Sequence, residues 1–272
     1  MPTMVSQGSG ERDSAGLDTK RILLLGGTTE ARDLAARLAA RADLTVTLSL
    51  AGRTLDPAPQ PVPVRSGGFG GVDGLADYLK TQDIDLIVDA THPFARQITA
   101  NARAASETAD VPLLRLERLG WDQVDGDRWT RVASVAEAVD ALGEVPRRVF
   151  LAIGRQEAKA FDAAPQHHYL VRSVDPVDPP LAAPNVGYIL ARGPFAVEAE
   201  VELLRGHGID IVVAKNSGGE ATYGKIVAAR ILGLPVVLIE RNVENDATRA
   251  ETVEDALPLI DHLLASGRKR GV

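Results

Sequence analysis

The same succession of sequence segments occurs twice in this chain, with roughly 120 residues between equivalent positions. The four matching pairs are 22–31 with 149–158, 84–88 with 209–213, 111–118 with 234–241, and 134–138 with 252–256. Residues 84–88, for example, read IDLIV, and residues 209–213 read IDIVV. Chance can supply one such match, but four in the same order predict two copies of one architecture that differ in loop length.

Each copy alternates short apolar runs with longer segments of helical periodicity. The apolar runs of the first copy lie at residues 21–25, 44–48, 84–88 and 112–116. Continuous runs of this kind are typical of parallel strands that are covered on both faces. Residues 30–41 place their apolar side chains on one face of a helix. Because strands and helices alternate, we predict an α/β protein of two tandem Rossmann-like domains, each with a parallel sheet.

The repeat also suggests where the copies meet. The last helix of each copy is predicted to begin at a capping-box-like pattern, at Ser134 and at Thr252. We therefore expect domains at residues 19–143 and 144–272, preceded by a disordered polar leader at 1–18. Ligands of such sheets bind beyond the carboxyl ends of the strands, so the active site is expected in an interdomain cleft.

Composition excludes several classes of function. The chain has no cysteine, which excludes disulfides, thiol nucleophiles and iron–sulfur ligation, and its five histidines show no metal-ligand spacing. A net charge of −7 argues against nucleic acid as a partner. No apolar run approaches the ~20 residues of a membrane span, and residues 1–18 lack the apolar stretch of a secretory signal. These features are typical of a cytoplasmic protein that binds small molecules without a protein-held metal.

The turn after the first predicted strand is a candidate dinucleotide site. Gly27, Thr28, Thr29 and Glu30 follow the strand and begin the next helix. Glycines allow close backbone approach, and free N–H groups at a helix start favour a pyrophosphate. The motif is not G-x-G-x-x-G, and an ordinary turn with helix capping remains an equal alternative.

Two further segments favour a dinucleotide site over an ordinary turn. The second strand ends at Ser49 and leads to Arg53 and Thr54, where an arginine accommodates the 2′-phosphate of NADP. A glycine-rich loop then carries Gly68, Phe69 and Gly70, of which the phenylalanine would pack on a flat ring. The alternatives are a solvated loop arginine and a flexible turn.

The loop after the third of these apolar runs carries the best-placed histidine. Thr91 and His92 follow residues 84–88 at the strand end expected nearest to a nicotinamide. An imidazole with an ordinary pKa suits proton transfer near neutral pH. A structural histidine that caps the following helix is an equal alternative. The other four histidines are interpreted as surface residues.

The loops of the second copy are rich in cations. The candidate substrate-binding residues are Arg155, Arg172, Arg192, Lys215, Ser217, Gly218, Gly219, Tyr223 and Lys225. The cations among them stand at predicted strand ends, so they predict a site for an anionic, carboxylate-rich substrate. Any one of them alone is equally consistent with a solvated surface charge.

The segments GGTTEA (26–31), DATHPFA (89–95), IGR (153–155) and KNSGG (215–219), with Tyr223 and Lys225, resemble the precorrin-6A reductase family of cobalamin biosynthesis. The resemblance covers residues 20–264. It implies an oxidoreductase that uses NADPH, bound by residues 19–143, to reduce one double bond of the tetrapyrrole precorrin-6A, giving precorrin-6B. The macrocycle would lie against residues 144–272.

The mechanism expected from this resemblance is hydride transfer followed by protonation. His92, Tyr223 or water is the expected proton donor. Lys215, Ser217, Lys225, Arg155 and Arg192 are expected to hold the substrate carboxylates. Three alternatives remain open: another NADP-dependent reductase on this scaffold, a non-catalytic nucleotide- or tetrapyrrole-binding module, and a tetrapyrrole methyltransferase.

Overall fold

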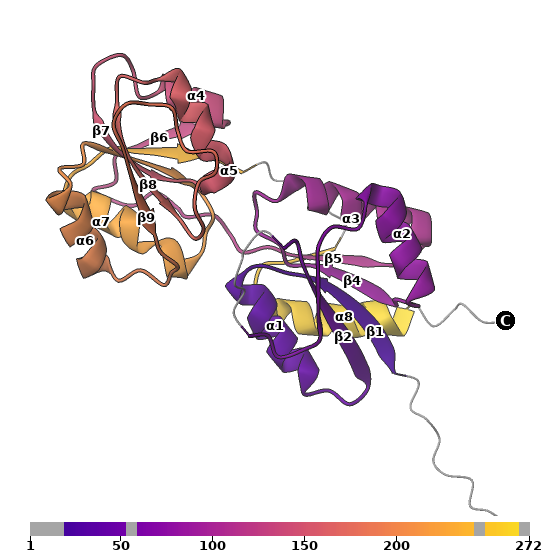
Figure 1. Cartoon of the computed structure of the whole chain (residues 1–272). Coiled ribbons are helices and arrows are strands. Elements are labelled where there is room, and N and C mark those ends of the chain that lie inside the picture. The colour runs from indigo at the N-terminus through magenta and orange to yellow at the C-terminus, as the bar shows by residue number, and fades with distance from the viewer. Residues whose placement is uncertain (1–18, 53–58, 242–247, 267–272) are drawn as a thin grey trace, which may run out of the picture.

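The computed structural model describes residues 19–52, 59–241 and 248–266 and folds them into two lobes (Figure 1). Each lobe is built on a six-stranded sheet in which all neighbouring strands are parallel. The predicted α/β class with two Rossmann-like units is therefore confirmed. The leader predicted at 1–18 lies outside the described residues.

The first lobe has the strand order β12-β5-β4-β1-β2-β3. Its strands are β1 (Lys20–Leu25), β2 (Leu44–Leu50), β3 (Val64–Ser66), β4 (Leu86–Asp89), β5 (Leu113–Leu116) and β12 (Arg249–Ala250). Its helices are α1 (Thr29–Ala39), α2 (Gly71–Thr81), α3 (Arg96–Ala109) and α8 (Val253–Ser266).

Helices cover both faces of the first sheet, α2 and α3 on one side and α1 and α8 on the other (Figure 1). Strand β1 reads as an unbroken apolar run because its alternate side chains enter these two cores. Helix α1 presents Ala31, Leu34 and Leu38 to the core, as its periodicity predicts.

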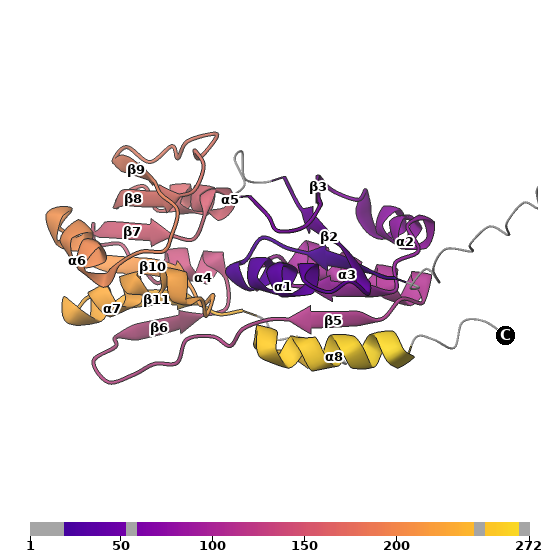
Figure 2. The same cartoon turned by 90° about the horizontal axis from the view of Figure 1, so that it is seen from below.

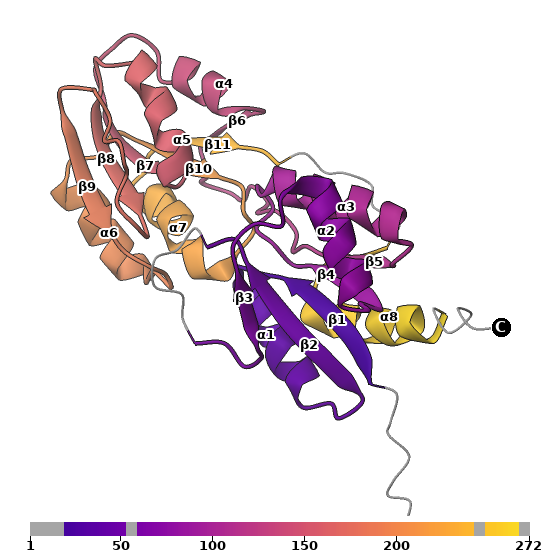
Figure 3. The same cartoon turned by 45° about the vertical axis from the view of Figure 1, so that its right-hand side comes forward.

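The second lobe has the equivalent strand order, β6-β11-β10-β7-β8-β9. Its strands are β6 (Trp129–Val132), β7 (Arg148–Ala152), β8 (His168–Ser173), β9 (Val186–Leu190), β10 (Ile211–Lys215) and β11 (Val236–Ile239). Its helices are α4 (Val135–Asp140), α5 (Arg155–Ala158), α6 (Val197–Gly206) and α7 (Gly224–Ile231), with short 3-10 turns η1 (Lys159–Ala163) and η2 (Glu220–Thr222). Helices α6 and α7 lie together on one face, and α4 and α5 pack on the other (Figure 3).

The sixth strand and last helix of each repeat lie on the sheet of the other repeat. Strand β6 belongs to the first repeat in sequence but pairs with β11, and β12 belongs to the second repeat but pairs with β5. Helix α8 packs in the core of the first lobe and α4 in that of the second. The expected boundary at residues 143/144 therefore differs from the division between the sheets. Repeat matching identifies equivalent segments, but it does not reveal which sheet a segment joins.

The chain connects the two sheets twice, from β5 to β6 through the first crossover segment (residues 117–128) and from β11 to β12 through the second, of which residues 240, 241 and 248 are described. Figure 2 shows the first of them leading from β5 to β6 at the edges of the two sheets. Among the described residues, no helix is long and apolar enough to cross a membrane. The described part of the chain also contains no group of three or more acidic or histidine side chains placed to hold a metal ion.

Candidate active site between the two lobes

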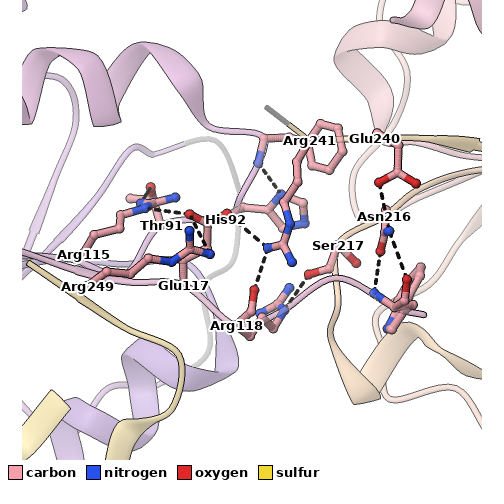
Figure 4. Close-up of polar contacts among 12 residues, drawn as sticks. Thr91, His92, Arg115, Glu117, Arg118, Asn216, Ser217, Glu240, Arg241 and Arg249 are labelled. Carbon is pink, nitrogen blue, oxygen red and sulfur yellow. Dashed lines mark hydrogen bonds and ion pairs between the residues drawn. The ribbon is translucent and has the colours of Figure 1, made fainter. Parts of the chain in front are cut away.

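Side chains at the carboxyl ends of strands from both sheets meet at the junction of the lobes (Figure 4). Arg118, just after β5, contacts both Glu30 of the first lobe and Ser217 of the second. Phe94, from the loop after β4, packs against the core of the second lobe, and the Lys215 ammonium lies 5.0 Å from its ring centroid. Direct contacts therefore bridge the junction where a cleft was expected.

Two cavities lie elsewhere. One of about 190 Å³ opens at the amino ends of the second sheet's strands, beside Arg148 and His168. The other, of about 360 Å³, lies between the end of α3 and α8, beside Glu107 and Leu263. Neither contains a side chain that the sequence assigned to a site, so the junction remains the candidate active site.

The loop after β1 has the backbone of a tight strand-to-helix turn. Gly27 has a φ of 126°, which only glycine adopts without strain, and a Cβ on Gly26 would lie 2.5 Å from Leu48 Cδ1. The Thr28 hydroxyl accepts a hydrogen bond from the Ala31 amide (3.1 Å) and donates one to the Ala90 carbonyl (2.8 Å). Thr28 therefore caps α1 and also joins the loops after β1 and β4.

The first turn of α1 is accessible but carries an acid. Thr29 is exposed, and Glu30 is partly buried. The Glu30 carboxylate pairs with the Arg118 guanidinium at 2.5 Å, which compensates its negative charge. The sequence reasoning missed Arg118, although a signal existed: the repeat pairs Glu117-Arg118 with Glu240-Arg241.

The edge formed by β2 and β3 carries a cation that was also missed. Arg65 donates from Nη1 to the buried Ser49 hydroxyl and to the Gly67 carbonyl, both at 3.0 Å, and from Nη2 to the Gly68 carbonyl. Its guanidinium lies 3.8 Å from the centroid of the Phe69 ring. Phe69, expected to face a flat ligand ring, thus has Arg65 stacked on it.

The other residues of the first lobe that were predicted to bind the nucleotide lie in the loop after β3 or outside the described residues. Gly68 is exposed, and Gly70 has a φ of 85° and precedes α2. Arg53 and Thr54 lie outside the described residues. The signal for Arg65 was its position at the end of β3, beside the glycines that the sequence had singled out.

Thr91 belongs to a buried polar network rather than to an open surface. Asp89 is fully buried and pairs with Arg115 at 2.6 Å. The Asp89 carboxylate accepts hydrogen bonds from the Thr91 amide (3.0 Å) and hydroxyl (2.7 Å), and Arg115 also donates to that hydroxyl at 3.2 Å. The network fixes the loop that carries His92.

His92 is partly buried, and its imidazole is neutral. Its Nδ1 accepts from the Phe94 amide at 3.3 Å. Helix α3 has no side-chain cap, so His92 does not cap the following helix, which was the alternative role. Burial lowers the pKa of His92 to about 3, and the charges of four cations act in the same direction; these are Arg118, Lys215, Lys225 and Arg115. The pKa of His92 therefore differs from the near-neutral value that the sequence led us to expect, because burial disfavours the charged ring and cations of both lobes act in the same direction.

Arg172 lies inside the second lobe. Its guanidinium pairs with Glu200 at 2.5 and 2.9 Å and lies between the rings of Phe150 and Phe195, with centroids at 4.8 and 3.7 Å. This placement differs from the predicted substrate contact. The end of β8 lies beneath α6, a burial that the strand pattern alone does not reveal.

Lys225 and Tyr223 are also engaged within the second lobe. The Lys225 ammonium donates to the Thr222 carbonyl at 2.6 Å and lies 4.8 Å from the Trp121 ring centroid. Burial lowers the pKa of Lys225 to about 7, and the charge of Arg172 adds to the effect. The Tyr223 hydroxyl accepts from Arg230 at 2.8 Å.

The loop after β10 packs on the first crossover segment. Lys215 pairs with Glu157, and the Ser217 carbonyl accepts from Arg118 Nε at 2.7 Å. A Cβ on Gly218 would lie 1.7 Å from the Leu119 carbonyl oxygen. A Cβ on Gly219 would lie 3.0 Å from Arg118 Cζ. This packing thus requires glycine at 218, whereas a side chain at 219 would require the Arg118 guanidinium to shift slightly. Of the other predicted cations, Arg155 begins α5 and Arg192 follows β9.

Asn216 lies in the KNSGG segment (215–219), but its sequence context alone did not predict a role for it. Its Oδ1 accepts from the Trp121 amide at 2.7 Å, and its Nδ2 donates to the Trp121 carbonyl and to Glu240. Glu117 in turn pairs with Arg115 and Arg241. These contacts tie both crossover segments to the strand ends of both sheets (Figure 4).

Comparison with known proteins agrees with this architecture. Residues 21–261 match the family model described as precorrin-6x reductase CbiJ/CobK. A precorrin-6A reductase of Sinorhizobium sp is 56% identical over 93% of this chain and 97% of its own length. One of Rhodobacter capsulatus is 51% identical over 89% and 96%. A solved structure of CobK precorrin-6A reductase matches with a TM-score of 0.86 and 49% identity, covering 90% of this chain and 97% of that one. The chain therefore belongs to the precorrin-6x reductase CbiJ/CobK family.

Proposed function

We propose that the protein reduces one double bond of the precorrin-6A macrocycle with NADPH and releases precorrin-6B. The observation that carries this proposal is the junction of the lobes. There Arg118 joins Glu30, at the start of α1, to Ser217 in the loop after β10, and four cations act on His92. The names of the similar proteins supply the substrate.

The first lobe fits a dinucleotide. Thr28 caps the Ala31 N–H of α1, which leaves the N–H groups of Thr29 and Glu30 for a pyrophosphate, and Gly27 allows its close approach. No carboxylate stands at the end of β2, where NAD-binding sheets hold the ribose hydroxyls: residues 49–52 read SLAG. Arg65, hydrogen-bonded to Ser49, supplies a cation there instead. This arrangement supports NADPH over NADH.

The cations of the junction fit a substrate with several carboxylates. Arg118 and Lys215 are both partly buried, so carboxylates placed beside them would form charge-assisted hydrogen bonds with little screening. Such carboxylates would counteract the charges that lower the pKa of His92. We therefore assign to His92 the uptake of a proton together with the substrate and its donation to the ring.

The chemical balance is simple. NADPH supplies a hydride to one atom of the double bond, and a proton reaches the neighbouring atom, so that the ring gains two hydrogens and NADP⁺ is formed. The protein positions both partners and limits the access of water. The Tyr223 hydroxyl is less suited to proton donation because it is held by Arg230.

The test is an assay with purified protein, NADPH and precorrin-6A. We expect the absorbance of the reduced nicotinamide to fall only when precorrin-6A is present, and the tetrapyrrole mass to increase by two hydrogens. Binding of both ligands without turnover would instead support a carrier module. Consumption of S-adenosylmethionine with methylation of the ring would support a methyltransferase.

Cofactor choice provides a second test. Arg65→Ala should raise the Kd for NADPH about 10-fold or more and leave the Kd for NADH nearly unchanged, because one charge-assisted contact is lost. Arg53→Ala tests the alternative cation that the sequence suggested. Lys80→Ala is the matched control, since it removes one positive charge at the far end of α2. Equal Kd values of the wild-type protein for the two nucleotides would contradict the assignment of NADPH.

A further inference from the structure

Glu30 presents an electrostatic problem for the proposed cofactor site. It is the second residue of α1, beside the N–H groups that would receive a pyrophosphate. A carboxylate at this position stabilises the helix start but repels a bound anion. A dinucleotide can bind there only if another group compensates the charge of Glu30.

Arg118 is placed to compensate it. Its Nη1 lies 2.5 Å from Glu30 Oε2, and its side chain is only 16% exposed, so solvent screens the pair weakly. The same guanidinium donates from Nε to the Ser217 carbonyl at 2.7 Å. One side chain therefore contacts the cofactor helix of the first lobe and the loop after β10 of the second.

The position of Arg118 is fixed from both sides. Its carbonyl accepts a hydrogen bond from Arg241 Nη1 at 2.5 Å, so the second crossover segment holds the first. Gly219 lies so close that a Cβ there would be 3.0 Å from Arg118 Cζ. The guanidinium is thus pre-organised, unlike a surface arginine that samples many rotamers.

We infer that Arg118 is a positioning residue that neutralises Glu30 for pyrophosphate binding and couples cofactor binding to the loop carrying Ser217. The inference rests on the proposed function. A pyrophosphate beside Glu30 brings further negative charge close to the same guanidinium, which stays paired with Glu30. Any adjustment of the guanidinium is transmitted to the Ser217 carbonyl, which it also holds. The substrate loop would then respond to the cofactor before the substrate arrives.

A double-mutant cycle tests the first half of this inference. The Kd for NADPH is measured by titration calorimetry for the wild type, Arg118→Gln, Glu30→Gln and the double variant. Arg118→Gln should weaken binding about 10-fold or more, because the charge of Glu30 is left uncompensated. Glu30→Gln alone should change it little, and the double variant should return to within about 3-fold of wild type.

The cycle separates the possible roles of Arg118. A residue that serves only to bind the pyrophosphate, or only to support the fold, gives a double variant as weak as Arg118→Gln, and this result would overturn the inference. Arg118→Lys should restore part of the affinity, since it restores the charge. Arg37→Gln is the matched control, because it removes an arginine paired with an acid at the far end of α1. If the wild type itself binds no NADPH, the proposed function fails rather than the inference.

The fluorescence of Trp121 tests the second half of the inference, the coupling of cofactor binding to the loop that carries Ser217. It is hydrogen-bonded through its backbone to Asn216, next to Ser217, and Trp129 is the other tryptophan. In a Trp129→Phe background, saturating NADP⁺ should change the emission of Trp121. The change should be lost when Glu30→Gln and Arg118→Gln are added, although this protein still binds NADP⁺. An unaltered emission in the parent, or an unaltered response in the variant, would refute the coupling.

Discussion

The charge state of His92 is determined by residues from both lobes. Its pKa is lowered to about 3 by burial and by four surrounding cations, so the ligand-free protein holds a neutral imidazole with Nδ1 facing the Phe94 amide. The same cations would be the first groups that an anionic substrate meets. In the mechanism proposed above, His92 would gain its proton only when carboxylates that compensate these cations are bound.

This pKa shift has a consequence for acid stability. Between pH about 6.5 and about 3, unfolding binds a proton at His92 that the folded protein lacks, so the free energy of unfolding falls as the pH decreases through this window. His92→Asn keeps an acceptor for the Phe94 amide but removes the titration. Its stability to urea should therefore decline less than that of wild type between neutral pH and about pH 5. His262→Asn, at an exposed site on α8, is the control. Equal declines for wild type and His92→Asn would contradict the placement of His92.

Arg172 should behave as a structural residue. Arg172→Met leaves Glu200 buried without its partner and should lower the free energy of unfolding by about 3–5 kcal/mol in urea denaturation. Replacing both residues, with Glu200→Leu, should cost less than Arg172→Met alone, because no uncompensated charge remains. Arg37→Met, which breaks an exposed pair, should have a smaller effect. If Arg172→Met instead increased the KM for the tetrapyrrole without loss of stability, the result would support the substrate contact predicted from the sequence.

At the scale of elements, the strands and the loops that follow them were largely predictable. Continuous apolar runs gave β1 and β4 to within two residues of their ends, and the periodicity of residues 30–41 gave α1. The contacts of those loops were not predictable, because they depend on which side chains cross between lobes. Glu30 and Arg118 are 88 residues apart in sequence, and no local pattern relates them.

The loop after β10 offers a prediction at this scale. Gly218 has a φ of 72°, and a Cβ there would meet the Leu119 carbonyl oxygen at 1.7 Å. Gly218→Ala must therefore displace the first crossover segment, and we expect a loss of about 1–3 kcal/mol in the free energy of unfolding. Gly206→Ala, in α6 with open space around it, should be neutral or stabilising by about 0.5–1 kcal/mol. Equal stability of the two variants would show that the loop does not need its glycine.

At the scale of the whole molecule, the exchange of the sixth strands changes what counts as a folding unit. The repeat matched residues 134–138 with 252–256 correctly as equivalent helices, yet each packs on the other repeat's sheet. The candidate active site lies where the chain leaves both sheets, so the connections that exchange the strands also carry Arg118 and Arg241. Because the sixth strands are exchanged, residues of the connecting segments lie between the loop after β1 and the loop after β10.

The exchange predicts which fragments of the chain fold. Residues 119–241 contain all six strands of the second sheet, with α4 to α7, whereas residues 144–272 lack β6 and α4 and carry β12 and α8 without their sheet. We expect the first fragment to unfold cooperatively on heating, as followed by circular dichroism, and to give dispersed amide resonances. The second fragment should aggregate or show no cooperative transition, because the edge of β11 and the apolar face of α8 are left uncovered. The two fragments differ by only a few residues in length, so size does not account for the contrast. Cooperative folding of 144–272 alone would mean that the sequence repeat, and not the sheet, defines the domain.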